Sequence, residues 1–179
     1  MWAVAAGAAL AVRVLGLLRT AGRASAHLDR AGELAELLKG TEDGPLPVAA
    51  LHAAIWCRIG RTEEARAVLD VRGPLDLSAD NWFSMLVWGP ACEAAAGTGD
   101  RDLAARAYER LAAYPDHTVT GGSGLCMGPA QAFLALAAWT VGEVDLATRH
   151  ADRAEDLCAD WGIPLCARWL QEQRQRYGF

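Results

Sequence analysis

The part of this chain whose residue types come closest to a reactive loop is the glycine-rich segment Gly121-Gly122-Ser123-Gly124. A phosphate-binding Walker loop would need Gly-Lys-Ser/Thr at its end, and a dinucleotide-binding loop would need glycine where Met127 stands. A hydrolase nucleophile elbow would need glycine where Leu125 stands. We therefore interpret the segment as a connection between helices. The alternative that stays open is an anion site, a small-molecule site or an enzyme site that uses the Gly121 to Gly128 loop.

Metal-ligating residue types are present, but their spacing does not favour a metal site. The four histidines form neither a His-x-x-x-His nor a Glu-x-x-His arrangement, and the five cysteines include no Cys-x-x-Cys pair. These residues are His27, His52, His117 and His150, and Cys57, Cys92, Cys126, Cys158 and Cys166. An odd number of irregularly spaced cysteines favours free structural thiols in a reducing cytoplasm. We expect no zinc, no other cofactor and no catalytic residue.

Tryptophan is the residue type that points most clearly to binding, because it is enriched at the hot spots of interfaces. The chain has seven, and six of them fall on or beside predicted helices: Trp56, Trp82, Trp88, Trp139, Trp161 and Trp169. Core packing is the ordinary role of each one. We nevertheless take Asn81, Trp82 and Trp88 as the candidate binding residues, on the inner groove of a helical stack.

The charge and hydropathy of the chain limit the classes of partner. A formal net charge of −5 and the absence of any run of Lys or Arg argue against direct nucleic-acid binding. Residues 2–18 are apolar apart from Arg13, yet basic residues do not precede them as in a secretory signal, and a membrane span would be less interrupted. We expect a cytoplasmic protein with a terminal helix over 2–20, whose outer side packs against a second copy of the chain or an upstream domain.

The elements that must position these residues are helices throughout. Apolar residues recur every three or four positions between Gly and Pro breaks, which predicts about three-quarters helix and negligible strand. Helical hairpins are expected near 48–70, 80–113 and 129–160, with terminal helices over 2–20, 23–38 and 165–177, in one domain spanning 1–179. Asp80 is expected to cap the second hairpin, Pro90 to kink it or split its first helix, and Pro129 to be the first residue of the third hairpin.

An internal repeat links the three hairpins. Each contains a glycine, an acid three residues later and an alanine five residues later: Gly60, Glu63 and Ala65; Gly99, Asp102 and Ala104; Gly142, Asp145 and Ala147. Glycine can adopt the left-handed conformation that ends a helix, and an acid suits the first turn of the next helix. Alanine lets the two helices approach closely. Because one hairpin alone exposes an apolar face, the hairpins are expected to stack.

This pattern resembles tetratricopeptide repeats, although the glycines are 39 and 43 residues apart where the family repeats at about 34. The stretch 46–169 is similar to the helical-repeat region of large actinobacterial ATP-binding transcriptional regulators of the LuxR or antibiotic-regulatory type. The segments that carry the likeness are Asp80-Asn81-Trp82, Tyr114-Pro115-Asp116-His117, Leu125 to Pro129 and Gly142 to Ala154. The resemblance implies an all-α solenoid of hairpins, acting as a non-catalytic regulatory or sensor arm that binds a protein partner or an upstream domain.

Overall fold

The computed structural model describes residues 36, 48–71, 73–121 and 125–179, and every structural statement concerns these residues. They form seven helices and two short strands, with 69% in helix, so the all-α prediction is confirmed at the level of class. The helices are α3 (Ala49–Arg58), α4 (Thr62–Asp70), α5 (Met85–Thr98), α6 (Arg101–Leu111), α7 (Ala130–Val141), α8 (Val144–Asp160) and α9 (Pro164–Tyr177). The predicted helices over 2–20 and 23–38 lie outside the described residues, apart from Glu36.

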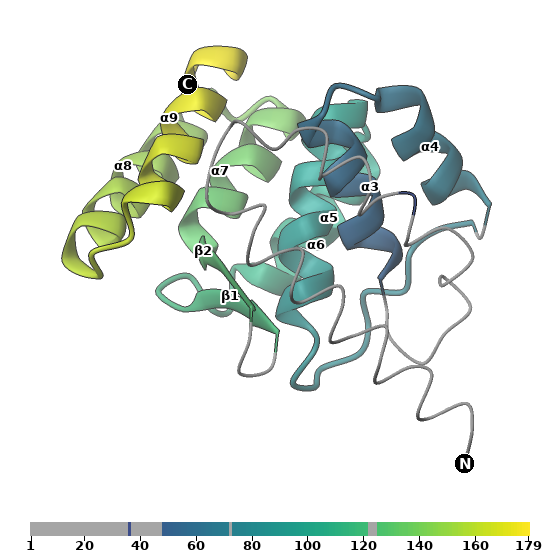
Figure 1. Ribbon diagram of the computed structural model, residues 1–179, viewed down its shortest axis with the longest axis horizontal. Coiled ribbons are helices and arrows are strands. Elements are labelled where there is room, and N and C mark those ends of the chain that lie inside the picture. Colours follow the sequence, from purple (N-terminus) through teal and green to yellow (C-terminus); the bar gives the residue numbers. More distant parts are fainter. Residues whose placement is uncertain (1–35, 37–47, 72, 122–124) are drawn as a thin grey trace.

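The helices pack as successive antiparallel neighbours. Helix α3 packs against α4, α5 against α6 and α7 against α8, while α5 also lies between α3 and α7. Across the molecule, the pairs follow one another in sequence order, from α3 and α4 on one side to α8 and α9 on the other (Figure 1). None of these helices combines the length and the apolar character needed to cross a membrane.

The repeated glycines, acids and alanines occupy equivalent places in the three hairpins. Each glycine follows the first helix with a positive φ: +79° at Gly60, +76° at Gly99 and +99° at Gly142. Each acid lies in the first turn of the second helix: Glu63, Asp102 and Asp145. Each alanine is fully buried: Ala65, Ala104 and Ala147. The three small side chains are therefore buried at equivalent positions, and their placement between the two helices of a hairpin stays a prediction.

Helix α5 begins later than the sequence predicts and runs without a break. Its first residue is Met85 with Ser84 before it, so the expectation that Asp80 caps this helix is wrong. Pro90 lies inside the helix, which rules out two short helices. Gly97 explains how closely α5 packs on α3, because a Cβ at this position would lie 2.4 Å from the Cys57 sulfur.

Two paired strands lie in the glycine-rich segment between α6 and α7, which the sequence predicts to be a loop. Strands β1 (Thr118–Gly121) and β2 (Leu125–Pro129) pair antiparallel with an irregularity after Val119. The expectation of negligible strand is therefore wrong in this segment, where the β-branched run Thr-Val-Thr suits a strand. Pro129 ends β2 with an extended backbone and precedes α7, so it is not the first helical residue.

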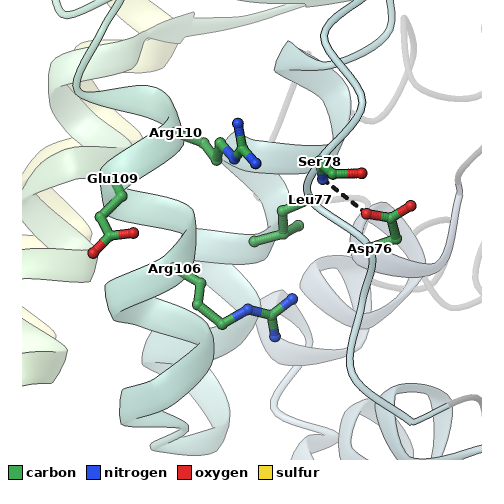
Figure 2. Close-up of a pocket in the computed structure, with 6 residues that line it drawn as sticks. All are labelled: Asp76, Leu77, Ser78, Arg106, Glu109 and Arg110. Carbon is green, nitrogen blue, oxygen red and sulfur yellow. Dashed lines mark hydrogen bonds between the residues drawn. The ribbon is translucent and has the colours of Figure 1, made fainter.

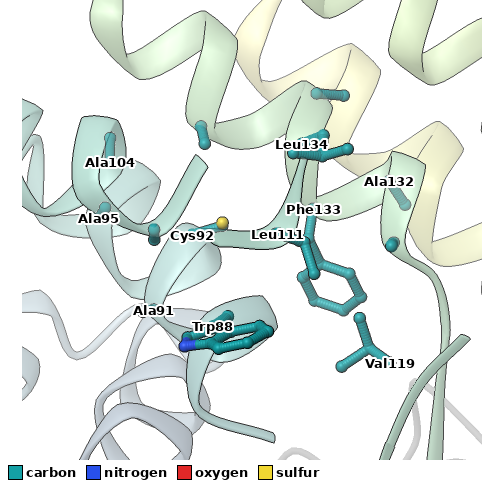
Figure 3. Packing of buried hydrophobic residues seen from close by; sticks show 14 of the residues in the cluster. Trp88, Ala91, Cys92, Ala95, Ala104, Leu111, Val119, Ala132, Phe133 and Leu134 are labelled. Atoms are coloured by element: carbon teal, nitrogen blue, oxygen red, sulfur yellow. The ribbon is translucent and has the colours of Figure 1, made fainter. Parts of the chain in front are cut away.

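The core is built from small side chains with a few large ones between them. Phe133, Leu111 and Trp88 fill the space between alanine-lined helices, and Val119 brings β1 onto the same cluster (Figure 3). Gly89 allows this contact, because a Cβ there would lie 2.7 Å from a Val119 methyl group. The position of β1 against α5 fixes one wall of the site described next.

Candidate functional site

The first helices of the hairpins do not form the open groove that we expected. Residues 49–57 of α3, 87–96 of α5 and 130–138 of α7 are all buried. Helix α9 adds to their cover: the ring of Trp169 lies 5.2 Å from Phe133 and 5.1 Å from the guanidinium carbon of Arg58. Among the described residues, a binding site would therefore lie outside these buried helix faces.

A shallow pocket of about 260 Å³ lies beside the start of α5, and we call it the Asp80–Tyr114 pocket. The residues that line it are Asp80, Asn81, Ser84, Met85, Trp88, Tyr114, His117, Thr118 and Thr120. Two of the three predicted binding residues, Asn81 and Trp88, are thus brought together. Trp82 does not line the pocket; its side chain is 68% exposed and its ring packs on Phe83 at 3.8 Å.

Aromatic rings form one side of the Asp80–Tyr114 pocket. Trp88 is only 2% exposed, and its indole N–H donates to the Leu77 carbonyl at 3.0 Å, so it is a fixed wall rather than a protruding anchor. Tyr114 stacks on it with ring centres 5.9 Å apart and planes 21° apart. His117 meets Tyr114 edge-on at 5.5 Å. These contacts hold three rings in fixed relative positions.

Polar groups from the turn before α5 also line the pocket. The Tyr114 hydroxyl donates to Asp80 Oδ2 at 3.2 Å, and the negative charge of Asp80 raises the pKa of Tyr114. The Asn81 side-chain oxygen accepts from the Phe83 amide at 2.9 Å. The Ser84 hydroxyl accepts from the Asn81 amide and donates to the Ala79 carbonyl. These bonds keep Asp80 and Asn81 at the rim of the pocket.

The Ser84 hydroxyl of the pocket is not placed to act as a nucleophile. The Ser84 hydroxyl is buried and donates to a backbone carbonyl instead of to a general base, which nucleophilic catalysis requires. The His117 and Tyr114 rings lie nearly perpendicular to one another. Rigid rings and a held carboxylate are features that fix the orientation of a ligand.

A second cavity of about 210 Å³ lies between the 76–78 segment and α6. Arg106 and Arg110 extend toward this segment from α6, while Glu109 points away (Figure 2). The Arg106 guanidinium donates to the Leu75 carbonyl. Hydrogen bonds from Ser78, with smaller contributions from the two arginines, lower the pKa of Asp76. These contacts fix the position of the connection between α4 and α5. This connection includes Asp80, which lines the Asp80–Tyr114 pocket.

The Gly121 to Gly128 segment forms part of the β-hairpin, and residues 122–124 lie outside the described residues. Gly128 has a φ of +114° and lies against Cys166, whose sulfur would be 3.1 Å from a Cβ there. In the part of the chain that the structure describes, no three His, Cys, Asp or Glu side chains are placed to hold a metal ion.

A partly buried series of polar contacts that the sequence did not suggest joins three helices. The ring of His150 contacts the Tyr108 hydroxyl through Nε2 at 2.9 Å and the Gln131 side-chain oxygen through Nδ1 at 2.5 Å. Because the amide oxygen can only accept, Nδ1 carries the proton and Nε2 accepts from Tyr108. Burial, with the nearby charge of Arg149, lowers the pKa of His150 and favours this neutral form. These two hydrogen bonds link α6, α7 and α8 through His150.

Two segments that carry the family resemblance, Asp80 to Trp82 and Tyr114 to His117, meet at the pocket although they lie more than thirty residues apart. No protein-family model matches the chain, and neither curated proteins nor solved structures similar to it were found. The likeness to the repeat region of LuxR-type regulators therefore stays a prediction.

The five thiols give a test of the predicted structural role of the cysteines. Burial raises the pKa of Cys57 to about 12 and of Cys158 to about 11, and it also raises those of Cys92 and Cys166. Because the thiolate is the reactive form, we expect only the exposed Cys126 to react quickly with Ellman's reagent at pH 8. Cys126→Ser should abolish the fast phase, and the other four should react only on unfolding. A fast phase that survives in Cys126→Ser would contradict this assignment.

Proposed function

We propose that the chain is a non-catalytic protein-binding module, a tetratricopeptide-like solenoid of stacked hairpins whose partner docks at the Asp80–Tyr114 pocket and on Trp82 beside it. The observation that carries the proposal is this pocket, where rigid aromatic rings and a held carboxylate lie next to an exposed tryptophan. Interfaces typically combine such a fixed pocket with an aromatic anchor.

The order of packing supports the solenoid. The second helix of each of the first two hairpins contacts the first helix of the next: α4 contacts α5, and α6 contacts α7. Side-by-side stacking of this kind is how repeat modules bury the apolar face that one hairpin leaves exposed. Equivalent glycine, acid and alanine positions in all three hairpins support the same reading.

The exposed Trp82, with Phe83 beside it, supports a protein partner. Trp82 and Phe83 lie one after the other in the turn before α5, with Trp82 68% exposed. A tryptophan buries a large apolar area when it enters an interface, and few side chains contribute more to binding. The likeness to LuxR-type regulators supports a regulatory arm, whose partner would be an upstream or separate regulatory domain.

Site-specific photocrosslinking in the source cells tests this function. A benzophenone amino acid at position 82 should capture a defined protein partner, because this side chain points into solvent beside the pocket. The matched control is the same label at Val71, which is 81% exposed and does not line the pocket. No product at position 82, or the same products at both positions, would contradict the proposed site. A captured protein with a nucleotide-binding or DNA-binding domain would support the regulatory arm.

A further inference from the structure

The lining of the Asp80–Tyr114 pocket includes a negative charge and no Lys or Arg. Asp80 is its one charged side chain apart from the titratable His117, and no Lys or Arg is among the lining residues. Within the described part of the chain, only Oδ2 of this carboxylate has a hydrogen-bond partner, so Oδ1 is available to a ligand. A negative group with a spare acceptor atom favours a ligand that brings a positive charge and N–H donors.

The rings beside Asp80 favour the same charge. The face of an aromatic ring is electron-rich and attracts a cation placed within about 6 Å of its centre. Trp88 and Tyr114 are fixed by their mutual stacking, and the Trp88 N–H is already used by Leu77. Because Trp88 is only 2% exposed, the ring whose π system a ligand can reach is that of Tyr114, which is partly exposed.

We propose that the Asp80–Tyr114 pocket binds a cationic side chain, Lys or Arg, of the partner polypeptide. This inference rests on the proposed function, because it names the group by which the partner is held. The alkyl stem would lie against Met85, and the cationic head would lie beside Oδ1 of Asp80 and the Tyr114 ring. A volume of about 260 Å³ is enough for one such side chain.

Other occupants fit the pocket less well. An anion would be drawn to the start of α5 but repelled by Asp80, which no Lys or Arg of the pocket neutralises. An apolar side chain would leave the free oxygen of Asp80 without a partner, at a cost in desolvation. The hydroxyls of Thr118 and Thr120 add further polar groups to the wall.

Titration of the full-length, ¹⁵N-labelled chain by NMR tests the proposal, with the indole N–H signal of Trp88 as the readout. The probes are the capped peptide Ala-Ala-Lys-Ala-Ala, the same peptide with norleucine in place of lysine, and free n-butylammonium. Norleucine keeps the alkyl chain and removes the charge. We expect the lysine peptide to bind at least about tenfold more tightly than the norleucine peptide. Equal binding of the two peptides, or binding of butylammonium without the lysine peptide, would overturn the proposal.

Two isosteric variants identify the carboxylate involved. Asp80→Asn keeps an oxygen for the Tyr114 hydroxyl but removes the charge, and it should weaken the lysine peptide about tenfold while the melting temperature stays close to that of the parent. Asp116→Asn removes an equal charge from an exposed residue outside the pocket lining and should not change binding. Equal effects of the two variants would show that only the net charge matters, which overturns the proposal.

The cation proposal and the proposed function can fail separately. If no peptide binds but the label at position 82 still captures a protein, the module binds its partner without a cationic anchor. If the lysine peptide binds at Trp88 but position 82 captures nothing, the pocket recognises cations and the assignment of a protein-binding module is wrong.

Discussion

Arg58→Met should lower the free energy of unfolding by about 3 kcal/mol, because it leaves a buried carboxylate without its partner. Arg58, at the end of α3, donates two hydrogen bonds to Glu93 of α5, at 2.6 and 2.8 Å. The Glu93 side chain is only 5% exposed, whereas that of Arg58 is 37% exposed. Burial by itself would lower the pKa of Arg58, but the charge and hydrogen bonds of Glu93 raise it above its usual value.

Urea unfolding followed by far-ultraviolet circular dichroism measures this effect, and the two partners should respond differently. Glu93→Leu should cost less than Arg58→Met, because the remaining guanidinium reaches solvent and lies over the Trp169 ring. The double variant should recover much of the loss, since no buried charge is left alone. A coupling energy below about 0.5 kcal/mol would show that the pair acts as a surface ion pair and not as a link between α3 and α5.

Local chemistry explains why the helices could be predicted from the sequence. Breaks at Gly60, Gly99 and Gly142 require a left-handed backbone, which glycine adopts at little cost, so they mark helix ends without reference to the rest of the fold. The predicted hairpins 48–70 and 129–160 agree to within one residue at each end with α3 to α4 and with α7 to α8.

The remaining features depend on contacts between distant residues. The β-hairpin is held by Val119 in the core and by the close approach of β1 to Gly89, neither of which local periodicity can reveal. The sequence predicts the start of α5 too early, because the side chains of Asn81 and Ser84 form hydrogen bonds that stabilise a turn before the helix begins. Asp80 instead pairs with Tyr114, thirty-four residues later.

Only the part of the site that depends on local sequence could be predicted. Asn81 and Trp88 were selected for residue type and helical position, and both line the pocket. Their partners Tyr114 and His117 were visible only as part of a family resemblance, because no spacing rule brings the end of α6 to the start of α5. The prediction of an open groove is wrong because residues 49–57, 87–96 and 130–138 of the first helices, which are largely alanine and other apolar residues, are buried.

Ala104→Leu should lower the free energy of unfolding by about 2 kcal/mol, because three extra heavy atoms must enter a contact with no free space. Ala104 is fully buried on α6 and belongs to the same core cluster as Ala95 of α5. Both are drawn in Figure 3. Leucine and alanine are both strong helix formers, so a loss of stability would report packing and not helix propensity. Thermal or urea unfolding of the purified chain measures the change.

The neighbouring residue supplies the control. Ala105 follows Ala104 on the same helix but is exposed, so Ala105→Leu should change the free energy of unfolding by less than about 0.5 kcal/mol. Ala147→Leu, at the equivalent buried place in the third hairpin, should be destabilising by a similar amount to Ala104→Leu. If Ala104→Leu and Ala147→Leu both unfold like the parent, these alanines do not set the distance between paired helices. The glycine, acid and alanine pattern would then be a coincidence of composition, and the support that it gives to a repeat architecture would be lost.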